Sequence, residues 1–234
     1  MLEFFQDPKV AEQVEYLLGN IPFAIWETVY STVLATLFAY VIGLPLGIVL
    51  VTGEKGGVRP LPAWVMKLLN IVINILRSVP FLILMIIALP LSKLIVGTKI
   101  GTIATIAPMV IAAFPLVARM VEGSIREVDR GVIEAAQSMG ASTWQIVTKV
   151  LLPEALPSLI SGGAITMTTI LGYGAMAGII GGGGLGNLAI TYGYYNFKMV
   201  VMWAAVIGLI VMVQIIQSIG TKLATVCDKR LRKS

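Results

Sequence analysis

The sequence contains no histidine and only one cysteine, Cys227. A disulfide framework requires at least a pair of cysteines, and a Cys/His metal site requires several such ligands, so both are excluded. The chain also lacks a Ser-His pair, and no two carboxylates fall together inside its apolar segments. Without a general base or an activated nucleophile, we expect no catalytic residues, no resident cofactor and no metal.

Charged residues are scarce as well. They make up 12% of the chain, whereas soluble domains carry about 25%. Hydrophobic residues make up 57% and the mean hydropathy is +0.92, so a soluble fold of this size would leave large apolar patches exposed. The sequence pI is about 9.4, but the basic residues lie at the ends of apolar runs, which argues against a nucleic-acid partner. Composition therefore predicts a membrane protein in contact with lipid.

Five apolar stretches are long enough to cross a membrane, taking about 20 residues per crossing. They cover residues 29–51, 67–89, 100–121, 155–180 and 199–220. We predict an all-α membrane protein with these five transmembrane helices in one domain, residues 26–221. Residues 1–25 are expected to form a short extracytoplasmic or interfacial helix, and residues 222–234 a basic cytoplasmic tail. The expected lipid contacts of the first segment are Phe4, Phe5, Val10 and Leu17.

Lysine and arginine are distributed unevenly between the two sides of these predicted spans. Twelve lie on one side, at Lys55, Arg59, Lys67, Arg119, Arg126, Arg130, Lys149, Lys222, Lys229, Arg230, Arg232 and Lys233. Four lie on the other, at Lys9, Lys93, Lys99 and Lys198. The positive-inside rule then places the N-terminus outside, and the C-terminus and the loop between the third and fourth spans in the cytoplasm.

That cytoplasmic loop carries helix start and stop signals. Asp129 is placed to cap a short helix through Met139, and Gly140 is a natural left-handed stop. Ser142 and Gln145 have the spacing of a capping box, which predicts a second short helix.

The same loop contains Glu134-Ala135-Ala136, three residues, Gly140, nine residues, and then the run Val150-Leu151-Leu152-Pro153. This pattern resembles the cytoplasmic coupling loop of the permease subunits of ATP-binding-cassette importers, with Val150 where isoleucine is usual. The small side chains would let a partner protein approach the backbone closely. The resemblance therefore implies that the residues contacting a separate ATPase are Glu134, Ala135, Ala136, Gly140 and Pro153.

Three further stretches resemble the methionine-importer branch of these permeases. They are residues 74–81 (Asn-Ile-Leu-Arg-Ser-Val-Pro-Phe), 151–157 (Leu-Leu-Pro-Glu-Ala-Leu-Pro) and the glycine-rich 172–186. The resemblance implies a multi-pass protein of the bacterial inner membrane that moves D- or L-methionine, or both, by alternating access. It further implies a homodimer, two ATPase subunits that bind ATP and Mg²⁺, and an external substrate-binding (lipo)protein.

Two alternatives stay open. A permease of this class could carry another small solute, such as a different amino acid or a phosphonate. The chain could also be a channel or secondary carrier that needs no ATPase. Ion-coupled carriers usually have acidic residues inside the membrane, whereas Glu27, at the edge of the first span, stands alone.

Arg77 lies inside the second predicted span, where a charge raises the free energy unless it has partners or water. We expect it either on the translocation path or an intersubunit contact, or in a structural role, with its side chain extended toward the cytoplasm or bonded to carbonyls freed by Pro80. Tyr173 and Met176 could face the path, because a thioether substrate suits apolar, polarizable surroundings.

The glycine run that includes Gly183 is not a phosphate-binding loop, because no Lys-Ser/Thr pair follows it. It is expected to form an extracytoplasmic turn that is either part of a gate or a plain helix end. Tyr192, Tyr194 and Tyr195 follow it and have the pattern of an interfacial aromatic belt.

Overall fold

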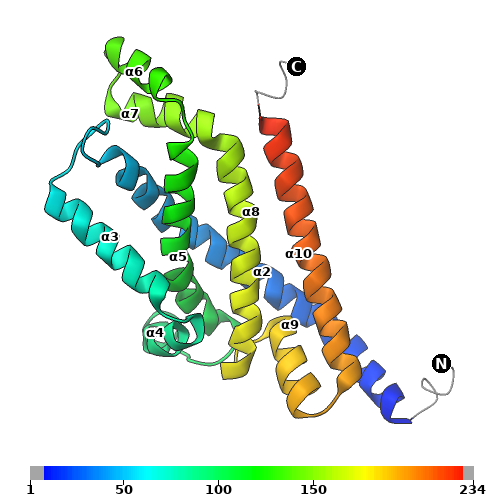
Figure 1. Cartoon of the computed structure of the whole chain (residues 1–234). Coiled ribbons are helices and arrows are strands. Elements are labelled where there is room, and N and C mark those ends of the chain that lie inside the picture. The colour runs from blue at the N-terminus through cyan, green and yellow to red at the C-terminus, as the bar shows by residue number, and fades with distance from the viewer. Residues whose placement is uncertain (1–7, 229–234) are drawn as a thin grey trace. The chain divides into compact units, whose positions relative to one another are not determined.

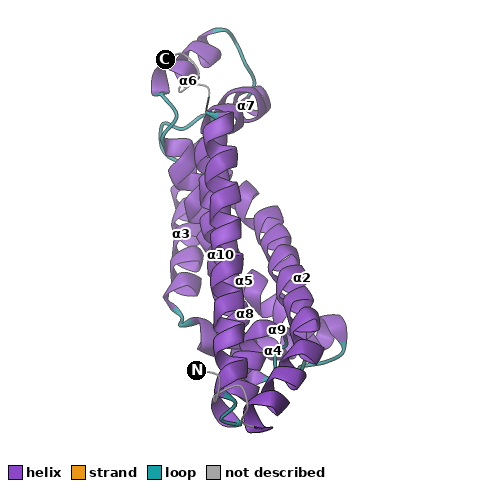
Figure 2. Ribbon diagram, turned by 90° about the vertical axis from the view of Figure 1, so that its right-hand side faces the viewer, coloured by secondary structure: helices purple, strands orange, loops and turns teal. Residues whose placement is uncertain are grey.

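The structure is a computed structural model that describes residues 8–228, whose helices are labelled in Figure 1. In this part of the chain every regular element is a helix, as Figure 2 shows. The prediction of an all-α fold is therefore confirmed. The predicted lipid contacts Phe4 and Phe5, and residues 229–234 of the predicted tail, lie outside the described residues.

Four helices form the greater part of the chain. They are α2 (Pro8–Thr52), α5 (Thr102–Arg126), α8 (Leu152–Ala177) and α10 (Met199–Cys227). Within residues 8–228, four helical segments are long and apolar enough to cross a membrane, namely Val10–Thr52, Thr102–Arg126, Thr143–Ile180 and Met199–Cys227. Residues 8–25, for which a separate interfacial helix was predicted, are instead the beginning of α2, with Val10 buried.

The second predicted span, residues 67–89, is two helices in the structure. They are α3 (Ala63–Ser78) and α4 (Phe81–Val96), which are bent by 108° and qualify as a span only together. Val79 between them has an extended backbone, with φ −79° and ψ 126°. The cause is Pro80, because proline disfavours the helical conformation of the residue before it and has no N–H to donate.

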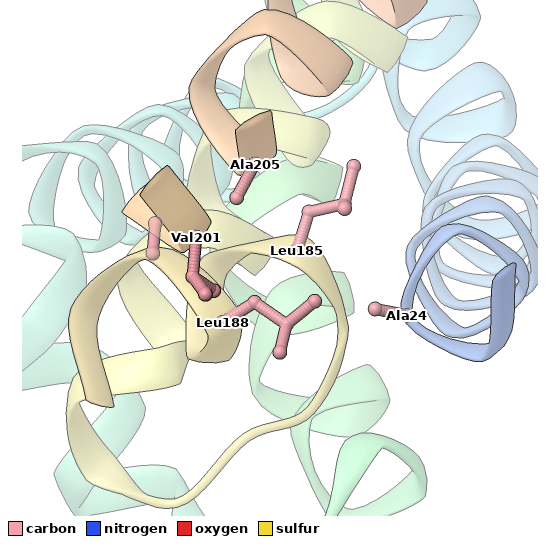
Figure 3. Close-up of a cluster of buried hydrophobic side chains, with 6 residues drawn as sticks. Ala24, Leu185, Leu188, Val201 and Ala205 are labelled. Carbon is pink, nitrogen blue, oxygen red and sulfur yellow. The ribbon is translucent and has the colours of Figure 1, made fainter. Parts of the chain in front are cut away.

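The chain packs as two units, each made of separate segments. Of the described residues, the first unit contains 8–36, 81–110 and 167–215, and the second contains 37–80, 111–166 and 216–228. The core of the first unit joins Ala24 of α2, Leu185 and Leu188, and Val201 and Ala205 of α10 (Figure 3). Leu17, a predicted lipid contact, packs against this core.

The second unit has its core where α2, α3 and α5 meet, at Leu50, Ile73 and Ala118. Two glycines of α2 allow that close approach. A Cβ at Gly43 would lie 2.6 Å from the Cβ of Val117, and one at Gly47 would lie 2.6 Å from the carbonyl oxygen of Ala118. Small residues at such crossings are typical of helix packing in membranes.

Candidate functional site

The loop with the Glu-Ala-Ala motif forms two capped helices in the second unit, α6 (Arg130–Ser138) and α7 (Thr143–Ile146). Asp129 accepts a hydrogen bond of 2.6 Å from the N–H of Gly131. The N–H of Ser142 donates to Gln145 Oε1 at 2.8 Å, and the N–H of Gln145 donates to Ser142 Oγ at 3.4 Å. Gly140 between the helices has φ +74°. The predicted cap, stop and capping box are all confirmed.

The second of these helices does not end before the long helix that follows it. α7 continues through a π-helical turn, η1 (Val147–Leu151), directly into α8. The N–H of Leu152 donates to the carbonyl of Val147, five residues earlier. Pro153 follows this turn as the second residue of α8, and its missing N–H removes one backbone donor from the continuous helix. Residues 143–180 therefore form one helical segment.

The motif residues differ in how accessible they are. Glu134, Ala135 and Gly140 are exposed, Pro153 is half-buried, and Ala136 is 4% exposed. The small side chain of Ala136 thus serves packing within the chain, whereas the other small residues leave the backbone open to a partner.

Two large apolar residues beside Gly140 were not singled out from the sequence. Met139 is 81% exposed and Trp144 is 74% exposed. Apolar side chains within an otherwise polar loop are the signal that could have identified them, because exposed Trp and Met are enriched in protein interfaces.

An arginine at the end of α5 bonds two carboxylates of the second unit. Arg126 donates from Nη1 to Glu54 Oε2 at 3.0 Å and from Nη2 to Glu54 Oε1. It also donates from Nη2 and Nε to Glu122 Oε1, at 2.8 and 3.2 Å. Glu54 belongs to the connector between α2 and α3, and Glu122 lies one turn before Arg126 on α5.

Arg119 extends this set of contacts to α3. Its Nη1 donates to Glu122 Oε2 at 2.6 Å. Its Nη2 donates to the amide oxygens of Asn70 at 2.8 Å and of Asn74 at 3.0 Å. Residues 54, 70, 74, 119, 122 and 126 are called the arginine network below. In the sequence, these two arginines were evidence for orientation only.

The glycine-rich turn of the first unit is attached to α2 and α5 by side chains. It connects η2 (Gly178–Ile180) to α9 (Gly184–Asn187), and Gly184 has φ +78°. The N–H of Gly184 donates to Glu27 Oε2 at 2.8 Å, and the Thr102 hydroxyl donates to Glu27 Oε1 at 2.6 Å. The N–H of Leu185 donates to Thr28 Oγ1 at 2.9 Å. Glu27, which the sequence presents as isolated, therefore caps this helix from another part of the chain.

Gly183 lies against the same carboxylate. A Cβ at this position would be 2.0 Å from Thr102 Oγ1 and 2.6 Å from Glu27 Oε2. Its φ of −100° is open to any residue, so close contact explains the glycine.

The aromatic residues after the turn do not act as one group. α9 continues as the π-helix η3 (Leu188–Tyr195), on which Tyr194 and Tyr195 are exposed. Tyr192 instead packs against the core of the first unit, with its ring centroid 4.9 Å from that of Tyr16. Only the last two are available for the predicted interfacial belt.

The candidate path residues fall in different units. Tyr173 on α8 stacks on Phe81 of α4, with ring centroids 4.1 Å apart and planes 6° from parallel. Met176, one turn further, is exposed, and both belong with Gly183 to the first unit. Arg77 belongs to the second unit, where it is exposed in the last turn of α3.

Residues 43–233 match the family described as the binding-protein-dependent transport system inner membrane component. The chain belongs to this family. The membership confirms the resemblance drawn from the coupling loop, and with the long apolar helices it makes the chain an integral protein of the bacterial inner membrane.

Several relatives within this transport family carry names that specify a substrate. A Vibrio cholerae protein named probable D-methionine transport system permease protein MetI is 50% identical over 208 residues, covering 88% of this chain and 92% of the relative. The Bacillus subtilis methionine import system permease protein MetP is 49% identical over 159 residues, covering 68% of this chain and 72% of the relative.

A solved structure of the same kind has a closely similar fold. A chain of the MetNI methionine ABC transporter in an inward-facing conformation has a TM-score of 0.87 and 40% sequence identity. The similarity covers 92% of this chain and 97% of that one.

Proposed function

We propose that this chain is the permease subunit of an ATP-binding-cassette importer that carries methionine, as the D-isomer, the L-isomer or both, across the inner membrane. The observation that carries the substrate assignment is the 50% identity with a probable D-methionine permease over 88% of this chain. Family membership and the capped α6–α7 pair support the transport class.

The proposed assembly is a homodimer with two ATPase subunits and an external substrate-binding (lipo)protein. Five crossings, counting the bent α3–α4 pair as one, would put the N-terminus outside and α6 and α7 in the cytoplasm. The excess of lysine and arginine on that side supports this orientation. ATP and Mg²⁺ are assigned to the ATPase subunits, so this chain performs no hydrolysis itself.

In the proposed mechanism, α6 and α7 form the contact with the ATPase. Glu134, Ala135 and Gly140 would lie at this contact, with the exposed side chains of Met139 and Trp144 as its apolar anchors. ATP binding would close the ATPase pair, displace these helices and open the permease outward, and hydrolysis would reset it. Ala136 and Pro153 would maintain the fold of the segment.

The substrate path is assigned to the neighbourhood of Tyr173 and Met176, with Gly183 at the outer gate. The exposed thioether of Met176 beside the Phe81–Tyr173 stack offers an apolar, polarizable surface suited to a methionine side chain. Arg77 is assigned to the path or to the contact between subunits, since it is exposed at the end of α3.

Reconstitution tests this function. The purified chain alone in liposomes should neither hydrolyse ATP nor take up methionine along a proton or sodium gradient. Addition of the cognate ATPase and binding protein should produce ATP-dependent uptake, which Glu134→Lys should weaken by reversing charge at the contact. Gradient-driven uptake by the chain alone would refute the proposal in favour of a secondary carrier. Transport of another solute but not methionine would overturn only the substrate.

A further inference from the structure

The arginine network balances its charges around one largely buried carboxylate, whereas the side chains of Arg126 and Glu54 are 43% and 44% exposed. Its two arginines and two glutamates sum to zero charge, and the Glu122 side chain is only 12% exposed. Both oxygens of Glu122 accept hydrogen bonds, Oε2 from Arg119 and Oε1 from Arg126. Charge-assisted bonds that satisfy both partners are the condition under which ionic groups persist in a partly buried site.

The network joins α5 to the α2–α3 connector and to α3, which lie 45 to 72 residues earlier in the sequence. Its members lie on the α2–α3 connector, on α3 and on the last two turns of α5. The connector is itself folded tightly, because the N–H of Arg59 donates to the carbonyl of Thr52 and that of Leu61 donates to the carbonyl of Gly53, each at 2.9 Å. On the α5 side of the network, α6 begins at Arg130, four residues after Arg126.

A cleft lies beside these bonds. It has a volume of about 320 Å³ and is lined by the connector and by α6 residues that include Ile133, Glu134 and Gln137. Close packing therefore does not fill the space between α6 and the connector. The pair of bonds from Arg126 to Glu54 crosses from α5 to the connector at this cleft.

We propose that the arginine network is the rigid link that transmits displacement of α6 and α7 to the connector and α3, and that Arg126 is its positioning residue. The proposal rests on the function proposed above. A guanidinium can bond two carboxylates in a fixed geometry, which an ammonium group cannot do. The link ends on α3, the helix that terminates at the Val79–Pro80 break.

The test measures methionine taken up per ATP hydrolysed by the complete complex of permease, ATPase and binding protein in liposomes. Arg126→Gln should lower this ratio at least about fivefold while ATP hydrolysis continues, because a coupling free energy of typical size is lost. Arg126→Lys should fall between Arg126→Gln and wild type. The matched control is Lys55→Gln, which removes a positive charge from the exposed residue next to Glu54 and should keep the wild-type ratio.

A double variant separates this link from general damage. Glu54→Gln should lower the ratio as Arg126→Gln does, and the two together should be no worse than Arg126→Gln alone, because both break the same contact. If Arg126→Gln fails to assemble, the ratio measured for Glu54→Gln on the connector tests the same contact. Additive effects, or an unchanged ratio in a transporting complex, would overturn the link alone. A wild-type complex without ATP-driven methionine uptake would overturn the proposed function and the link with it.

Discussion

Removal of the Glu27 carboxylate should loosen the glycine-rich turn. Glu27→Ala leaves the N–H of Gly184 and the hydroxyl of Thr102 without their acceptor, and both bonds are short, at 2.8 and 2.6 Å. Hydrogen bonds to a charged group contribute about 1.5–3 kcal/mol each, and water reaching this half-buried site recovers part of that. We expect Glu27→Ala to lower the free energy of unfolding of the turn by about 3 kcal/mol. Glu27→Gln, which keeps one acceptor oxygen, should lower it by about 1 kcal/mol.

Gly183→Ala should disturb the same contacts by adding a side chain instead of removing one. Its Cβ would be 2.0 Å from Thr102 Oγ1 and 2.6 Å from Glu27 Oε2, so the carboxylate or the hydroxyl must move. The expected loss is about 2–3 kcal/mol, and in the Glu27→Ala background it should be smaller because the bonds at risk are already gone. Gly123→Ala is the control, since nothing lies within 4 Å of a Cβ there.

Hydrogen exchange of the amides of Gly184 and Leu185 measures this effect directly. A loss of about 3 kcal/mol corresponds to exchange faster by roughly 150-fold in Glu27→Ala, if exchange occurs by local opening. The midpoint of thermal unfolding of the purified protein in detergent should fall in parallel. Unchanged exchange at Gly184 in Glu27→Ala would refute the assignment of Glu27 as the cap. Equal costs of Gly183→Ala in both backgrounds would show that the two residues act separately.

Three further predictions concern coupling, topology and the path. Gly140→Leu should abolish ATP-driven uptake while the protein remains folded. The reason is that a side chain at φ +74° costs about 1–2 kcal/mol locally and would face the ATPase. Normal transport by this variant would show that the segment is only a connector. In a Cys227→Ala background, an impermeant thiol reagent on intact cells should label a cysteine at Asn187 and not one at Thr143; the reverse pattern would overturn the topology. Tyr173→Ala should lose about 1 kcal/mol of stacking energy with Phe81 of α4, and it should lower uptake more than ATP hydrolysis. Tyr173→Phe should retain the stacking and the uptake. Equal losses of uptake in the two variants would argue against a role for the stack.

Features determined by neighbours in the chain could be predicted from the sequence. The caps at Asp129 and Ser142 and the left-handed Gly140 depend on residues two or three positions away, and all are present. The sequence indicated that Pro80 frees carbonyls, but the span 67–89 was predicted as one helix and the 108° bend was not expected. A count of apolar residues reports length, and it does not register a missing N–H.

Contacts between distant residues left no local pattern. Glu27 is hydrogen-bonded to Thr102 and Gly184, which are 75 and 157 residues away in the sequence. Arg126 is hydrogen-bonded to Glu54, which is 72 residues away. The Glu-Ala-Ala spacing marked the loop proposed for coupling but could not show that Ala136 is buried and its neighbour Ala135 exposed. Which face of a short helix packs inward depends on the surrounding helices, which the spacing alone does not describe.

The interval between Gly140 and Val150 ends in the π-helical turn Val147–Leu151, and this turn affects the direction in which α7 faces. A π turn is equivalent to one residue inserted into an α-helix, and each residue of an α-helix turns the chain by about 100°. If this turn changed to regular α winding with all its residues kept, α7 would rotate by about that angle about the axis it shares with the start of α8. Trp144 would then point in another direction although every helix remained. The nine residues between Gly140 and Val150 thus fix an angle as well as a length.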